Sequence, residues 1–198
     1  MLNIVLFGAP GAGKGTQATL LADKHELVHL STGEILRQEI AQGTELGKLA
    51  QKKIDRGELV PDDVVIDMIR EQIEKYADAK GFIFDGYPRT QAQAKALDQL
   101  MEEKGMHISS MVALDVTMDE LTDRLLKRGK DSGRVDDQSI DVIKNRIDVY
   151  HKKTEPLIEY YQAQEKYHPI NGSGPIEDIF NRLHQHVNNC KDNNDLVA

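Results

Sequence analysis

A glycine-rich loop close to the N-terminus constrains this chain more than any other feature. The loop runs from Gly8 to Thr16, follows the apolar segment Leu2 to Phe7 and leads into a helix-compatible stretch. Glycines let successive backbone N–H groups converge on an anion without Cβ clashes, and a helix N-terminus adds positive potential. A strand, this loop, Lys14 and a helix in that order predict a phosphate-binding loop in which Lys14 is the mobile charge.

The loop departs at one position from the pattern G-x-x-x-x-G-K-[ST]. Gly15 follows Lys14 and Thr16 comes one place later, so the hydroxyl that commonly binds Mg²⁺ is missing from its usual position. We therefore expect phosphates and waters to supply most of the metal's ligands. A dinucleotide-binding loop fits less well, because it requires G-x-G-x-x-G and Thr16 stands where its last glycine should be.

The rest of the chain alternates short apolar segments with longer helix-compatible ones, which predicts βαβ units and a parallel sheet covered by helices on both faces. The predicted strands are Leu2 to Phe7, Leu27 to Leu30, Phe82 to Phe84, Met111 to Val116 and Tyr167 to Ile170. The predicted helices span 13–24, 34–42, 62–77, 90–104, 118–128, 138–165 and 176–189.

Three segments fall outside this alternation. Residues 31–60 hold two helical pieces without a strand between them, which predicts a small helical flap. Residues 129–137 are polar and contain Gly129 and Gly133, which predicts a loop between helices that can serve as a lid. Residues 188–198 form a polar tail that we expect to fray.

Composition narrows the class of protein. A chain of 198 residues suits one domain with small flaps, and a formal net charge of -8 argues against a general binder of nucleic acid or anionic membranes. A single cysteine, Cys190, excludes an internal disulfide and a four-cysteine zinc site, so we expect no structural zinc. No apolar run is long enough to span a membrane and no signal peptide opens the chain, so a cytoplasmic location is expected.

The third predicted strand ends in an acid followed by a tight turn. Asp85 closes the strand, and Gly86 and Pro88 shape the turn that places Arg89 beside the carboxyl edge of the sheet, where ligands of open α/β sheets bind. In phosphate-loop proteins an aspartate at this position commonly binds Mg²⁺, directly or through water. We therefore predict Asp85 as the metal-binding carboxylate.

A locally basic segment lies further along this acidic chain. Residues 124–134 carry five basic side chains against the single acid Asp131. Arg124 and Arg128 are four residues apart and share one helix face, and guanidinium groups suit both bidentate phosphate contacts and stacking on a base. Next to a phosphate loop, the segment is better explained as an anion-binding surface than as a solvated helix face.

Taken in order, these motifs resemble the nucleoside monophosphate kinases, and the adenylate kinases in particular, over roughly residues 1–185. The resemblance implies a P-loop NTPase fold with a five-stranded parallel sheet, a core of 1–30, 61–128 and 138–185, an NMP-binding flap at 31–60 and a short lid at 129–137. It also implies Mg²⁺ as cofactor, ATP, AMP and ADP as substrates, and a monomer. The motifs that carry it are Gly8 to Gln17, Ser31 to Arg37, Asp85 to Thr90, Arg124 to Gly129, Arg134 to Asp137 and Thr154 to Leu157.

The resemblance also assigns roles to individual residues. The ATP-binding set is Gly11, Ala12, Gly13, Lys14, Gly15, Thr16, Arg124, Arg128 and Gly174. The AMP-binding set is Thr32, Arg37, Glu58, Leu59, Val60, Gly86, Tyr87, Pro88, Arg89, Gln93, Arg134 and Arg146. The catalytic set is Lys14, Arg89, Arg128, Arg134 and Arg146. The chain is one residue longer than the family pattern between Asp137 and Arg146, which makes Arg146 the assignment that depends most on the alignment.

The implied reaction is reversible transfer of the terminal phosphoryl group of ATP to AMP. A UMP/CMP-type kinase is the close alternative. Relatives of that type carry asparagine after the Pro-Arg pair, whereas here Thr90 follows Arg89, and Gln93 is placed to read an adenine edge. A non-catalytic nucleotide switch is the alternative from another class, and the missing Asn-Lys-x-Asp motif and the density of arginines argue against it.

Overall fold

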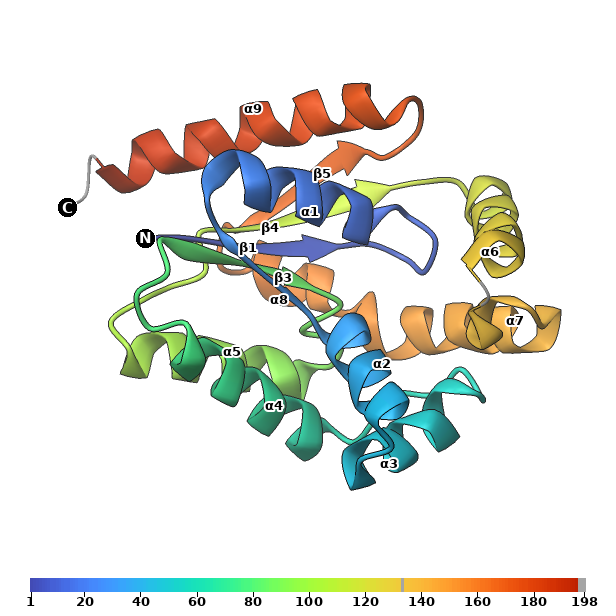
Figure 1. The fold of residues 1–198 in the computed structure, drawn as a ribbon. Coiled ribbons are helices and arrows are strands. Elements are labelled where there is room, and N and C mark those ends of the chain that lie inside the picture. Colours follow the sequence, from blue (N-terminus) through green and yellow to red (C-terminus); the bar gives the residue numbers. More distant parts are fainter. Residues whose placement is uncertain (133, 196–198) are drawn as a thin grey trace.

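A five-stranded parallel sheet forms the centre of the protein in the computed structural model, which describes residues 1–132 and 134–195 (Figure 1). Its strand order is β2-β3-β1-β4-β5, and every neighbouring pair is parallel. The predicted fold class is confirmed, and each predicted strand is found to within one residue at either end. The strands are β1 (Leu2–Phe7), β2 (Val28–Ser31), β3 (Gly81–Asp85), β4 (Ser110–Asp115) and β5 (Tyr167–Asn171).

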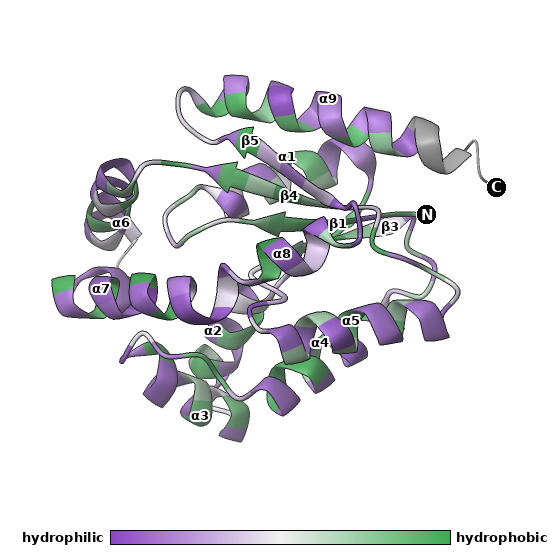
Figure 2. Cartoon of the chain, turned by 180° about the vertical axis from the view of Figure 1, so that it is seen from behind, coloured by the Kyte–Doolittle hydropathy of each residue, from purple (hydrophilic) through white to green (hydrophobic). Residues whose placement is uncertain are grey.

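Helices cover both faces of the sheet. Helices α1 (Lys14–His25) and α9 (Ile176–Asp195) lie on one face, and α4 (Asp62–Lys75), α5 (Gln91–Glu103) and α8 (Leu157–Gln162) lie on the other (Figure 1). Alternate residues of β1 point to opposite faces, so Ile4 and Leu6 join the core beneath α1 and α9, and Val5 and Phe7 join the other core. The apolar strands and the inward helix faces are visible as green in Figure 2.

The predicted flap consists of two short helices, α2 (Thr32–Gln42) and α3 (Glu45–Ile54). Helix α2 begins directly after β2. The Ser31 side chain accepts a hydrogen bond from the Glu34 backbone N–H at 3.4 Å, which caps the N-terminus of α2. The two helices pack closely, because Gly47 in α3 has no side chain to hold them apart: a Cβ there would lie 2.1 Å from the backbone oxygen of Glu39.

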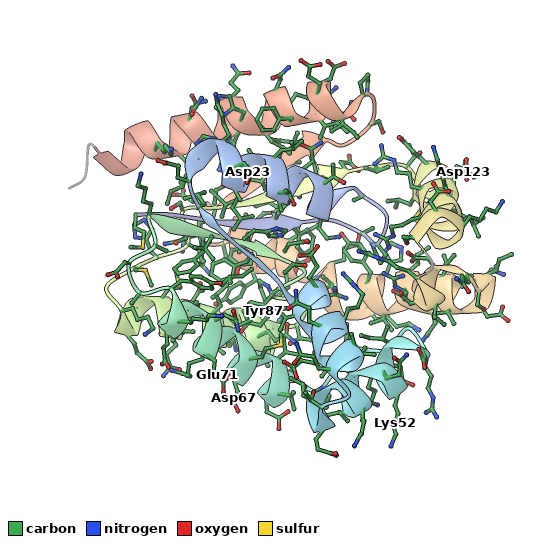
Figure 3. The ribbon with its side chains drawn as sticks, viewed as in Figure 1. Asp23, Lys52, Asp67, Glu71, Tyr87 and Asp123 are labelled. Carbon is green, nitrogen blue, oxygen red and sulfur yellow. The ribbon has the colours of Figure 1, made fainter. Side chains whose placement is uncertain are left out.

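Replacing Gly47 with alanine should therefore destabilise the protein, although alanine favours helices. The gain in helix propensity is about 1 kcal/mol, whereas the overlap with a backbone oxygen costs about 2 kcal/mol or more because the helices must move apart. Chemical denaturation should show the loss, and Lys52→Ala, an exposed change on the same helix (Figure 3), should show none. A more stable Gly47→Ala protein would contradict the close packing.

Two predictions about the second half of the chain are wrong. The segment 129–137 is not mainly a loop: α6 (Met118–Ser132) covers its first four residues, and a 3₁₀ turn, η1 (Val135–Asp137), forms its last three. Gly133, named as part of that loop, lies outside the described residues. The single helix expected over 138–165 is divided into α7 (Ile140–Val149), a π-helical turn η2 (Tyr150–Thr154) and α8, because Pro156 has no N–H to continue the ladder.

The C-terminal helix is longer than the expected span of 176–189. Helix α9 runs to Asp195, while the fraying expected of the tail stays a prediction. Its later residues are held by side-chain contacts along the helix, such as Asn188 with His184 at 3.2 Å and Cys190 with His186 at 3.4 Å. Residues 196–198 lie outside the described part. Among the helices that the structure describes, none combines the length and the apolar character needed to cross a membrane.

Candidate active site

One cavity of about 720 Å³ opens at the carboxyl edge of the sheet, where the segments after β1, β2 and β3 meet the flap, α6 and α7. Every residue of the predicted site lines it, from the phosphate loop at one end to Gln93 at the other. The structure therefore brings the predicted residues together, while the substrate that each one contacts stays a prediction.

The phosphate loop forms one end of this cavity. Gly11 and Gly13 have φ angles of +90° and +93°, which glycine adopts without strain, and a Cβ on Gly11 would lie 2.8 Å from the backbone oxygen of Leu121. Lys14 opens α1, and its Nζ donates to the carbonyl oxygens of Gly8 and Ala9 at 2.7 and 3.0 Å. Burial lowers the pKa of Lys14 to about 8, so the lysine is mostly charged at neutral pH and a bound phosphate would favour that form further.

Asp85 lies beside the phosphate loop at the end of β3. Its Oδ2 accepts from the Ser31 hydroxyl at 3.3 Å and lies 3.5 Å from Nε2 of His29. Burial alone would raise the pKa of Asp85, but the nearby His29 ring and the charge of Lys14 hold it below its ordinary value. An ionised carboxylate 3.4 Å from where a Cβ of Gly15 would lie suits a cation bound to phosphates in this loop.

The other end of the cavity is built on the turn after β3. The Thr32 hydroxyl and the Arg89 Nε both donate to the Gly86 carbonyl oxygen, at 2.9 and 2.8 Å. Gly86 has a φ of +74°, and a Cβ there would lie 2.9 Å from both the Arg89 guanidinium and the Thr32 hydroxyl. Burial lowers the pKa of Arg89, an effect to which the nearby charge of Arg146 adds. The buried ring of Tyr87 lies in the interior beside this turn (Figure 3).

Gln93, the predicted reader of the adenine edge, is buried and partly engaged by the protein. Its Oε1 accepts from the Arg89 backbone N–H at 2.8 Å, and its Nε2 donates to Asp62 at 2.8 Å. An amide has two acceptor lone pairs and two N–H donors, so half of its capacity is left for a ligand. The protein contacts also fix the orientation of the amide.

Two arginines that line the cavity, Arg128 and Arg146, share an acidic partner. Arg128 of α6 makes a bidentate pair with Asp137, with contacts of 2.6 and 3.1 Å. Arg146 of α7 contacts the same carboxylate and lies 2.8 Å from an oxygen of Asp136. These acids orient two guanidiniums that would otherwise repel each other. Burial would raise the pKa of Asp137, but Arg128 and Arg146 hold it below its ordinary value.

Arg134 and Arg37 differ from these paired arginines. Within the described part of the chain neither guanidinium has a hydrogen bond or an ion pair, although both line the cavity. Burial lowers the pKa of each, and nearby guanidiniums add to the effect: Arg134 acts on Arg37, and Arg128 acts on Arg134. Two arginines held near other cations without a partner form a site that is short of negative charge, as an anion-binding site should be.

Known proteins are similar to this chain over nearly its whole length. The adenylate kinase family model matches residues 6–166 of the chain. An adenylate kinase of Flavobacterium psychrophilum is 51% identical over 96% of this chain and 100% of its own length. The adenylate kinase of Bacteroides thetaiotaomicron is 52% identical over 91% of this chain and 95% of its own length.

The chain belongs to the adenylate kinase family. The resemblance inferred from the motifs is thereby confirmed over nearly the whole chain. A third adenylate kinase, from Parabacteroides distasonis, is 50% identical over 96% of this chain and 100% of its own length.

Sequence reasoning missed the acids that organise this adenylate kinase site. Asp136 and Asp137 were noted only as part of a motif, yet they hold Arg128 and Arg146, and Asp137 is fully buried. His29, which contacts Asp85, belongs to none of the motifs described above. The signal was present for the acids, because two adjacent aspartates after a basic segment are candidates for ion pairs. Nothing in the sequence pattern pointed to His29.

Proposed function

We propose that the chain catalyses the reversible transfer of the terminal phosphoryl group of ATP to AMP, giving two ADP. The observation that supports this most is that one cavity joins a phosphate loop to a second anion-binding end containing Thr32, Arg37 and Arg89. The guanidiniums of Arg128, Arg134 and Arg146 line the same cavity. Two nucleotides with their phosphates facing each other would occupy such a cavity, the donor on the phosphate loop and the acceptor on the turn after β3.

Phosphoryl transfer requires in-line positioning and neutralisation of charge more than it requires a protein nucleophile. The AMP phosphate is already anionic at neutral pH, so the reaction needs no general base. The backbone N–H groups of the phosphate loop and Lys14 would hold the donor phosphates. The guanidiniums would neutralise the charge on the transferring group, and closure of the flap over it would exclude water.

The residues present fit a nucleotide-bound Mg²⁺. No group of three or more acidic, histidine or cysteine side chains in the described part of the chain could enclose a metal ion. Mg²⁺ often takes one carboxylate, several waters and substrate phosphates, and the ionised Asp85 beside the phosphate loop offers that carboxylate. When bound, the ion would neutralise phosphate charge, and Asp85 would hold it directly or through water.

Asp85→Asn should weaken the effect of Mg²⁺ on ATP binding. The amide keeps the shape of the carboxylate but loses its charge, so the Mg²⁺-dependent gain in ATP affinity should fall about tenfold. Calorimetric titration of ATP with Mg²⁺ or with EDTA measures this without relying on turnover. Asp115→Asn is the matched control, because Asp115 also ends a strand of the same sheet, β4, but is exposed. An unchanged Mg²⁺ dependence would remove Asp85 from the metal site.

A coupled assay with ATP, Mg²⁺ and AMP, CMP or UMP tests the proposed function. We expect ADP formation with AMP at a kcat/KM well above that with CMP or UMP. Preference for a pyrimidine would favour the UMP/CMP-type alternative, and nucleotide binding without any transfer would favour a switch. We further propose a cytoplasmic monomer, because a single cysteine fits a reducing compartment and residues of one chain supply both the phosphate loop and the arginines of the cavity. Sedimentation with and without nucleotides tests the oligomeric state.

A further inference from the structure

The carboxylate of Glu120 on α6 joins two elements at the donor end of the cavity. One of its oxygens accepts from Nη2 of Arg124 at 2.5 Å, and the other accepts from the Ser173 hydroxyl at 2.5 Å. Arg124 lies one turn further along α6, whereas Ser173 belongs to the loop after β5, 53 residues away in the chain. Glu120 therefore ties α6 to that loop.

Both partners of Glu120 belong to structures that form the donor end. Arg124 lines the cavity, and its Nη1 donates to the carbonyl oxygen of Ala12 in the phosphate loop at 3.2 Å. Ser173 precedes Gly174, which also lines the cavity and has a φ of +107°. The Arg124 guanidinium also donates to the Gly172 carbonyl oxygen at 2.9 Å. Glu120 therefore contacts both the guanidinium and the glycine-containing loop, and it reinforces the direct contact between Arg124 and Gly172.

Glu120 itself does not line the cavity, so any effect on a ligand must pass through its two partners. Nor does the loop need Glu120 in order to fold. Arg182 of α9 donates to the Ser173 carbonyl oxygen at 3.2 Å, and a Cβ on Gly172 would lie 2.6 Å from the Val116 side chain, so the loop is packed independently. The Glu120 side chain is 34% exposed, and an ion pair so exposed adds little to stability.

We propose that Glu120 is a positioning residue for the phosphoryl donor, which holds Arg124 and the loop 172–174 at the separation that receives the base of ATP. The proposal rests on the proposed function, since that function places ATP at the phosphate-loop end. It predicts a selective effect: the affinity for ATP depends on Glu120, and the affinity for AMP does not.

Four variants test the proposal. Glu120→Ala breaks both hydrogen bonds and should raise the Kd and KM for ATP roughly fivefold, with kcat and the KM for AMP within about twofold of wild type. Glu120→Gln should restore most of the affinity, because its amide can accept from Arg124 and donate to the Ser173 oxygen. Ser173→Ala should resemble Glu120→Ala. The double variant should lose less than the two single losses combined, because both break the same bridge.

Glu103→Ala is the matched control, since it removes an exposed acid whose partners, Arg70 and Gln99, do not line the cavity, and it should leave all constants unchanged. Thermal unfolding checks that each variant is folded. If the wild type shows no transfer between ATP and AMP, the proposed function is wrong. If it is active, three results would overturn the role of Glu120: an unchanged affinity in Glu120→Ala, an equal loss for ATP and AMP, or no rescue by Glu120→Gln.

Discussion

Replacing Arg134 with methionine is expected to lower kcat about a thousandfold while the protein stays as stable as the wild type. The magnitude follows from other phosphoryl-transfer enzymes, in which removing one arginine that neutralises the transferring group costs 10³-fold or more. Stability should not fall, because in the described structure the Arg134 guanidinium has no hydrogen bond or ion pair to lose. Removing a cation from the vicinity of Arg128 and Arg146 relieves repulsion, so any change in stability should be a small increase.

Steady-state kinetics and thermal unfolding of the same preparations check both halves of this expectation. Lys127→Met is the matched control, because Lys127 lies on the adjoining helix and carries the same charge but is exposed and does not line the cavity. Its kcat should be within about twofold of wild type. If Arg134→Met retained most of its activity, Arg134 would not act on the transferring group; a large loss of stability would show that it has a structural partner.

The sequence was sufficient to predict the sheet and the phosphate end of the site. Both rest on local rules: short apolar segments bounded by turns form buried strands, and a glycine loop between strand and helix binds phosphate. The carboxyl ends of parallel strands meet at one edge, so Asp85 and Arg89 after β3 had to lie near Lys14 after β1. The parallel topology thus brings motifs that are separate in the sequence into one cavity.

The segment around the lid was harder to predict, because tertiary contacts override local composition there. Gly129 suggested a loop, but a Cβ at this position would lie 2.4 Å from the Asp137 backbone oxygen, so the glycine allows α6 and η1 to approach. The division of 138–165 depends on Pro156 and on the Thr154 hydroxyl, which donates to the Arg89 carbonyl oxygen at 2.9 Å. That contact joins residues 65 positions apart, so no local sequence pattern predicts it.

Replacing Asp137 should have a large effect on stability, because its single buried carboxylate pairs with two arginines. Asp137→Asn should lower the free energy of unfolding by about 3 kcal/mol, the scale seen when one member of a buried ion pair is removed. Asparagine keeps one acceptor oxygen, but its NH₂ group would face a guanidinium, donor against donor. The activity should fall as well, since Arg128 and Arg146 lose the group that orients them.

The gap in the free energy of unfolding between wild type and Asp137→Asn should depend on pH if the ion pair causes it, and not if packing does. The folded-state pKa of Asp137 lies below its ordinary value of 3.8, so its stabilising contribution is complete above that value and is lost as the pH falls through the folded pKa. Urea unfolding should therefore show a constant gap between wild type and Asp137→Asn near neutral pH and a shrinking gap below about pH 4. Asp148→Asn, an exposed change on α7, should show no gap at any pH. A gap that persisted unchanged into acid would mean that Asp137 stabilises the protein by its shape and not by its charge.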